Sequence, residues 1–333
     1  MLRAEYNSLI YAYESNHQDI LNIYNGGLII ANEANTINNG SSNSASSTAS
    51  VAGTTATKTA DKVNDASSAV SDTVKSTENK TIDTVSVFKK VSERVKELIK
   101  KIGEMLSSLM RKVQNRLRLL NETDKGFFNM YYKRKSMVKP YKAVKVITYT
   151  YNNSILSNTL ERLVPEINLC LKKFKLMEGT TNNNGRVSDI ISSNSKEMLE
   201  KLYEPYCKGT KVSNTQEFIK YIVSQFRGEK KELVYKESDL PKIEQYALST
   251  KQISTKCNNY IKIAQESYNE IKAIEYVVGK NSKDTKVLQL ISNNTMKAAT
   301  LYNALTTIIK AYYELCLEQS LNYRIILKKF YQF

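Results

Sequence analysis

The sequence predicts a mainly α-helical protein built from long helices, with a minor β patch near residues 141–151. The chain has 333 residues but only four prolines and 11 glycines, so few positions interrupt a helix. Apolar residues recur at spacings of three and four over long stretches, which is the period of one helix face. A single stretch, Tyr141 to Tyr151, alternates strongly as a strand does.

Residues 1–33 are expected to form an N-terminal helix. They include His17, the only histidine of the chain, which we expect to lie on the surface. A Ser-His-Asp triad or a Cys-His pair would have to use this residue, and a site with two histidine ligands is excluded. The first residues lack a basic region followed by an apolar one, so no secretory signal is predicted.

Residues 34–83 are rich in Ser, Thr, Asn and Ala and are interpreted as a flexible linker that contains a weak helix. Val63, Ala66, Val70 and Val74 have helical spacing, but a helix of such small residues needs a partner to cover it. At the start of this segment, Glu33 completes a small-x-Glu tripeptide. It is a candidate cleavage site for a protease that trims proteins inside a capsid during maturation.

Residues 84–138 form the predicted basic amphipathic helical region. Its apolar seam follows alternating gaps of three and four and then rotates away from a strict heptad. The seam consists of Phe88, Val91, Val95, Leu98, Ile102, Met105, Leu109, Val113, Leu117 and Leu120. The polar run from Asn121 to Asp124 is expected to break the helix, with Asn121 or Thr123 capping the next turn. An aromatic and basic run, Phe127 to Lys135, follows the break.

Positive charge is concentrated in this region. From Lys89 to Lys145 there are 17 Lys and Arg against five Asp and Glu, a net +12 of the chain's +16. Three interpretations remain open: a solvated helix face, a phosphate-binding surface, and a helix lying on a membrane surface. The narrow seam without Trp disfavours the membrane. The candidate nucleic-acid-binding residues are Lys100, Lys101, Arg111, Lys112, Arg116, Arg118, Lys133, Arg134 and Lys135.

Residues 139–333 are predicted to form a C-terminal helical domain. The strand at 141–151 needs a partner, for which Gly185–Ile191 and Glu232–Tyr235 are the candidates. Helices are expected at Ser154–Met177, where Pro165 could introduce a kink, and at two shorter segments. Those shorter helices are Ser195–Tyr203 and Thr215–Phe226, the second of which begins with a capping-like sequence.

An antiparallel helical hairpin is predicted at residues 241–330, with its turn at Gly279–Ser282. The first seam is Ile253, Cys257, Tyr260, Ala264, Ser267, Ile271, Ile274 and Val278. The second seam is Val287, Ile291, Asn294, Ala298, Leu301, Leu305, Ile308, Tyr312 and Leu315. Leu317–Phe333 is expected to pack back on the domain or on a partner.

The residues do not indicate an enzyme. There is no Walker-type or Rossmann-type glycine loop, no HExxH sequence and no CxxC pair. The four cysteines are far apart and are interpreted as small buried or half-buried thiols in a reducing compartment. They are Cys170, Cys207, Cys257 and Cys316. We therefore expect no catalytic residue, no metal site and no cofactor.

Three segments occur in an order that resembles the internal virion (inner head or core) proteins of large tailed bacteriophages. A Ser/Thr/Asn linker leads into the basic helix from Val87 to Val113. The aromatic-lysine element Lys125–Tyr132 follows, and then the Lys-aromatic segment Tyr141–Tyr151. The resemblance implies a non-enzymatic structural protein inside the particle, in contact with packaged DNA or other virion proteins. It also implies assembly in the host cytoplasm, and trimming in such proteins would fit Glu33.

The expected partners follow from this interpretation and from the charge. They are other virion proteins, DNA or another polyanion, and further copies of this chain in a homo-oligomer. Two alternatives stay open. One is a helical interaction or scaffolding component without nucleic-acid contact, and the other is a basic amphipathic protein that binds a membrane surface.

Overall fold

A computed structural model describes residues 84–176, 185–274 and 285–333. The predicted N-terminal helix, the linker, His17 and Glu33 lie outside the described residues. The hairpin turn predicted at Gly279–Ser282 also lies outside them.

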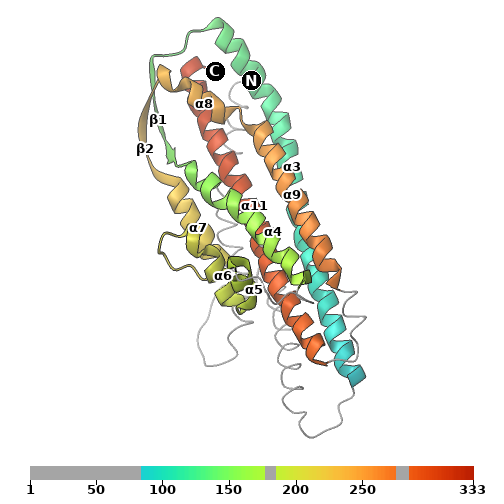
Figure 1. The fold of residues 1–333 in the computed structure, drawn as a ribbon. Coiled ribbons are helices and arrows are strands. Elements are labelled where there is room, and N and C mark those ends of the chain that lie inside the picture. Colours follow the sequence, from blue (N-terminus) through green and yellow to red (C-terminus); the bar gives the residue numbers. More distant parts are fainter. Residues whose placement is uncertain (1–83, 177–184, 275–284) are drawn as a thin grey trace, which may run out of the picture.

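The predicted fold class is confirmed: the described residues are mainly helical and carry one small two-stranded sheet. The long helix α11 (Thr285–Tyr331) lies at the centre. Around it pack α3 (Thr84–Met137), α4 (Glu161–Leu176) and α9 (Thr250–Lys272), and α9 also contacts both α3 and α4. Figure 1 shows these four helices side by side along the long axis of the molecule.

Helix α3 runs without interruption through the region where a break was predicted, so that prediction is wrong. The predicted seam is buried or half-buried from Val91 to Leu120. The same face continues through Asp124, Phe127 and Tyr131, which are all buried. Asp124 is one of the polar residues that suggested a helix end, but it lies on the packed face of α3. A partner distant in the sequence compensates there for its buried charge.

The strand β1 (Ala143–Tyr151) confirms the predicted β patch and pairs antiparallel with β2 (Arg227–Lys236). The candidate partner Glu232–Tyr235 lies within β2. The other candidate, Gly185–Ile191, is wrong because it largely coincides with the helix α5 (Arg186–Ser192), which buries Ile190 and Ile191 in the core.

Strands β1 and β2 together form a two-stranded ribbon, and a β-bulge between Tyr149 and Tyr151 shifts the register of their pairing. Beside it, Gly228 lies so close to Thr150 that an added Cβ would clash with the Thr150 hydroxyl oxygen.

The shorter helices begin where side chains cap them. In α6 (Ser195–Tyr203) and α7 (Thr215–Phe226), the bounds match the prediction. The Asn194 and Asn214 side chains accept hydrogen bonds from the first backbone N–H groups of the two helices. The Ser154–Met177 prediction resolves into a π-helical turn, Leu156–Leu160, followed by α4 with Pro165 inside it. The wider turn precedes the position where proline cannot donate its backbone hydrogen bond.

Two adjoining hydrophobic clusters hold the molecule together, and α11 contributes to both. The larger cluster joins the seams of α3, α4, α9 and α11. The smaller one joins the C-terminal part of α3, the inner face of β1, α8 (Leu240–Ala247) and the end of α11. The prediction that Leu317–Phe333 packs back on the domain is therefore confirmed. Among the described helices, none has a stretch both long and apolar enough to cross a bilayer.

Candidate polyanion-binding surface

Three of the nine candidate cations lie along one exposed face of α3. Lys100, Arg111 and Arg118 are all exposed. Lys100 and Arg118 are 18 residues apart, which is about five helical turns, and Arg111 lies within about 20° of both around the helix axis. They therefore form a line about 27 Å long, on the side of α3 opposite its buried seam.

The neighbouring candidates lie off this line. Lys101 is turned toward Glu97, with 3.7 Å between its Nζ and a carboxylate oxygen. Lys112 is exposed on a different face, and Arg116 is half-buried and has an interaction partner. The cations of α3 thus surround its outer half and do not form a single stripe.

Arg94 is one of the cations counted in the basic region, but it does not lie on an exposed face of α3. It is buried, and its Nη2 donates to Met296 Sδ at 2.9 Å. Burial also lowers the pKa of the Arg94 guanidinium. Part of the region's formal charge is therefore turned inward.

The last three candidates lie in the final turns of α3, where positively charged side chains stabilise the end of a helix even when they bind no ligand. Lys133, Arg134 and Lys135 are exposed, and the last two lie in the terminal turn, where cations stabilise the helix dipole. Lys135 Nζ donates to Glu244 Oε1 at 2.8 Å and lies 5.5 Å from the ring centroid of Tyr131. Lys135 is thus engaged within the molecule.

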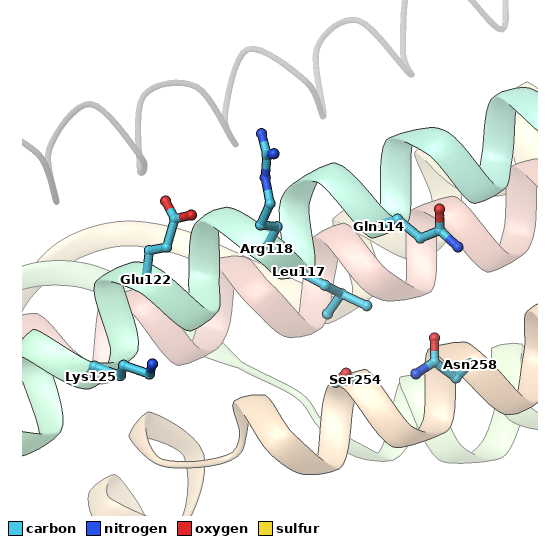
Figure 2. Close-up of a pocket in the computed structure, with 7 residues that line it drawn as sticks. All are labelled: Gln114, Leu117, Arg118, Glu122, Lys125, Ser254 and Asn258. Atoms are coloured by element: carbon cyan, nitrogen blue, oxygen red, sulfur yellow. The ribbon is translucent and has the colours of Figure 1, made fainter.

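A groove of about 710 Å³ between α3 and α9 adjoins the Arg118 end of the line. Six of its seven lining residues are polar or charged, and both signs of charge are present: Gln114, Leu117, Arg118, Glu122, Lys125, Ser254 and Asn258. In Figure 2 the side chains of Arg118 and Glu122 extend away from α9, whereas Ser254 and Asn258 line the α9 side. Glu104 is also exposed on this outer half of α3, so carboxylates interrupt the cations.

The strongest buried polar site was missed by the sequence analysis. Arg324 of α11 is fully buried, and its Nη1 lies 2.6 Å from Asp124 Oδ1. Its Nε donates to the Ala247 carbonyl at 3.0 Å, and the Thr250 hydroxyl donates to Asp124 Oδ2 at 2.5 Å. The guanidinium lies 4.7 Å from the ring centroid of Phe127. This pair joins α3, α11 and the junction of α8 with α9.

A second ion pair, with a buried carboxylate and a partly exposed guanidinium, connects the ribbon to the central helix. Arg227 Nη1 of β2 lies 3.3 Å from Glu318 Oε1 of α11, whose side chain is almost fully buried. Tyr151 donates a hydrogen bond to the same oxygen, and Asn322 donates one to Tyr151. In the sequence, these two pairs could have been suspected from Glu318 and Arg324, because each is a charged residue within a long and largely apolar stretch.

The predicted thiols are free and buried. Burial raises the pKa of Cys170 and of Cys316 to about 12, and of Cys207 to about 11. In the part of the chain that the structure describes, no three His, Cys, Asp or Glu residues gather as metal ligands would. Comparisons with models of protein families, with curated proteins and with solved structures find no match to this chain.

Proposed function

We propose that this chain is a non-enzymatic helical structural protein of a phage particle, held against packaged duplex DNA by the outer face of α3. The observation that carries the proposal is the line formed by Lys100, Arg111 and Arg118 on an unbroken, packed helix. Cations at fixed positions neutralise phosphates and release condensed counterions without first having to be ordered.

The charge of the molecule supports the same proposal. Residues 1–83 contain five Lys and Arg and nine Asp and Glu, a net charge of −4, so residues 84–333 carry +20. The electrostatic field of such a large positive charge favours association with a polyanion, whatever the sequence of that polyanion. The resemblance to internal virion proteins supports DNA as the polyanion and the capsid interior as the location.

Salt-dependent binding to duplex DNA tests the proposal. Fluorescence anisotropy of the full chain should give an affinity that falls steeply with salt, with a logarithmic slope of about 0.9 for each phosphate neutralised. The variant Lys100→Gln/Arg111→Gln/Arg118→Gln should lower that slope by about two to three. Binding that is absent at low salt, or indifferent to salt, contradicts the DNA role.

A matched control removes the same charge elsewhere. Lys196→Gln/Lys242→Gln/Lys262→Gln also lowers the net charge by three, at exposed positions on α6, α8 and α9. It should leave the salt slope nearly unchanged. An equal effect of both variants would mean that DNA responds to total charge and that the outer face of α3 has no special role.

A second candidate function is a helical interaction component that contacts other virion proteins or further copies of this chain. The specific observation in its favour is the alternation of charge on the outer half of α3, where Glu104 and Glu122 lie among the cations. Such a face suits a partner helix of complementary pattern. Light scattering after size exclusion should then detect an oligomer at salt concentrations that abolish DNA binding.

A further inference from the structure

The two-stranded ribbon presents an outer face of unusual composition. Side chains alternate between the two faces of a strand, and Val144 and Val146 point into the smaller cluster. The outward positions of β1 are Ala143, Lys145, Ile147 and Tyr149, and the register places Lys236, Val234, Glu232 and Lys230 opposite them. Ile147 and Val234 are diagonal neighbours on this face and are 66% and 56% exposed.

The outer face is also cationic. Its eight outward positions hold three lysines, Lys145, Lys230 and Lys236, against one carboxylate, Glu232. That carboxylate is paired with Lys145, with 3.3 Å between the lysine Nζ and a carboxylate oxygen. Tyr149 lies with Arg227 at 4.8 Å and Lys230 at 5.9 Å from its ring centroid. Two exposed apolar side chains are thus surrounded by positive charge, a combination complementary to a polyanion that also offers apolar groups.

The ribbon is held rigidly from behind, so its outer side chains are not needed to keep it folded. Its ends are closed by hydrogen bonds from the Glu237 N–H to the Lys142 carbonyl at 2.9 Å and from the Asn152 N–H to the Phe226 carbonyl at 2.8 Å. Isolated two-stranded ribbons are marginally stable, and here the packed inner face supplies the support. Figure 1 shows β1 and β2 along one flank of the helical body.

We propose that this outer face is a second DNA contact, which enters the major groove of duplex DNA; the proposal rests on the DNA role of the chain. The major groove is about 12 Å wide and admits a two-stranded ribbon, whose strands lie about 4.8 Å apart. Ile147 and Val234 contact the C5-methyl groups of thymine, the apolar groups that this groove displays. Lys230 and Lys236 contact the flanking phosphates.

A lipid surface fits the same face less well. Only Ile147 and Val234 are large aliphatic side chains among the eight outward positions, and Glu232 lies directly opposite Ile147. Inserting these two side chains into a headgroup layer would bring that carboxylate and its lysine partner toward an apolar region, at a desolvation cost. In the wide, hydrated major groove both charges keep their contact with water and with polar base edges.

The test compares two duplexes that differ only in the thymine methyl group. Alternating adenine-thymine DNA presents methyl groups in every register, and the same duplex with uracil presents none. The full chain should bind the thymine duplex about fourfold more tightly for each methyl group buried. Ile147→Ser/Val234→Ser should lose this preference. The control Leu169→Ser/Leu290→Ser, which alters two exposed leucines on α4 and α11, should keep it.

Each outcome separates this proposal from the general DNA role. Equal affinity of the wild-type chain for both duplexes, or a preference that survives in the ribbon variant, overturns the ribbon contact. The salt-dependent role of α3 stands in that case. Absence of any DNA binding overturns both proposals. Flotation with phosphatidylserine vesicles supplies the last comparison. If the ribbon variant alone loses vesicle binding and still prefers the thymine duplex, the groove contact is overturned. The outer face of the ribbon is then assigned to a lipid surface.

Discussion

At the scale of single residues, Arg324 has the most demanding environment among the described residues. A guanidinium removed from water loses much hydration free energy, and Asp124, Thr250 and the Ala247 carbonyl compensate for that loss. The pair therefore contributes less to net stability than to the relative positions of the helices that it joins. Removing one partner is nevertheless costly, because the other charge stays buried.

Arg324→Met should lower the free energy of unfolding by about 3–5 kcal/mol, because Asp124 is left as an uncompensated buried carboxylate. Denaturant titration of the full chain measures this loss. The double variant Asp124→Leu/Arg324→Met should recover most of the stability, since it removes both buried charges. A double variant as unstable as the single one would show that the carboxylate was not the source of the cost.

The buried cysteines give a prediction on pH. Because burial raises the pKa of Cys170 to about 12 from an ordinary value of 9.0, the folded state favours the neutral thiol. This contribution to stability is fully present below pH 9 and is lost as the pH rises toward about 12. At pH 8 an aromatic disulfide reagent should therefore modify the four thiols only as fast as the chain unfolds. Rapid modification of the native protein would contradict their burial.

At the scale of elements, the continuity of α3 is the main difference between prediction and structure. The sequence from Asn121 to Asp124 has the polar composition of a helix start. Yet Thr123 donates to the Leu120 carbonyl inside the helix, and Asp124 faces Arg324. Local propensity was overridden by a contact with a residue 200 positions away, which no local pattern contains.

A proline at position 122 distinguishes a continuous helix from two helices meeting there. Glu122 is exposed, so the substitution loses no buried contact. In the interior of α3, Glu122→Pro should cost about 3 kcal/mol or more, because it removes a backbone hydrogen bond and introduces a clash. At the first position of a new helix, proline would be tolerated. Thermal unfolding monitored by circular dichroism, with Glu122→Ala as the reference, measures the difference.

The ribbon illustrates the opposite case at this scale. Its first strand was predictable, because β-branched and aromatic residues alternate over a short range. The second strand was only one of two candidates, since Glu229 to Glu232 is polar throughout. Residues 227–236 form the second strand because α7 ends at Phe226 in the core and the following residues lie alongside β1.

At the scale of the whole molecule, α11 makes the described residues one packed body. Residues 311–324 are buried on all sides of the helix, and both hydrophobic clusters contain its side chains. The sequence placed a domain boundary at residue 138. In the structure, α3 on one side of that boundary and α9 and α11 on the other share the larger cluster.

Cavities in the two clusters should therefore affect the same unfolding transition. Leu305→Ala in the larger cluster and Phe330→Ala in the smaller one each remove a fully buried side chain, at a cost of about 2–5 kcal/mol. Both should lower the midpoint of one cooperative denaturation curve, and their effects should be nearly additive. Two separate transitions, each sensitive to only one variant, would show that the clusters unfold independently.

The sequence by itself determined the fold class, the helix seams, the bounds of α6 and α7 and the location of β1. These depend on hydrophobic periodicity and on capping within a few residues, so a local pattern contains them. Only the tertiary structure decided that α3 is continuous, which strand completes the ribbon, and which cations remain exposed. Each of these depends on partners distant in the sequence, such as Arg324 for Asp124, because a buried charge takes its position from what surrounds it.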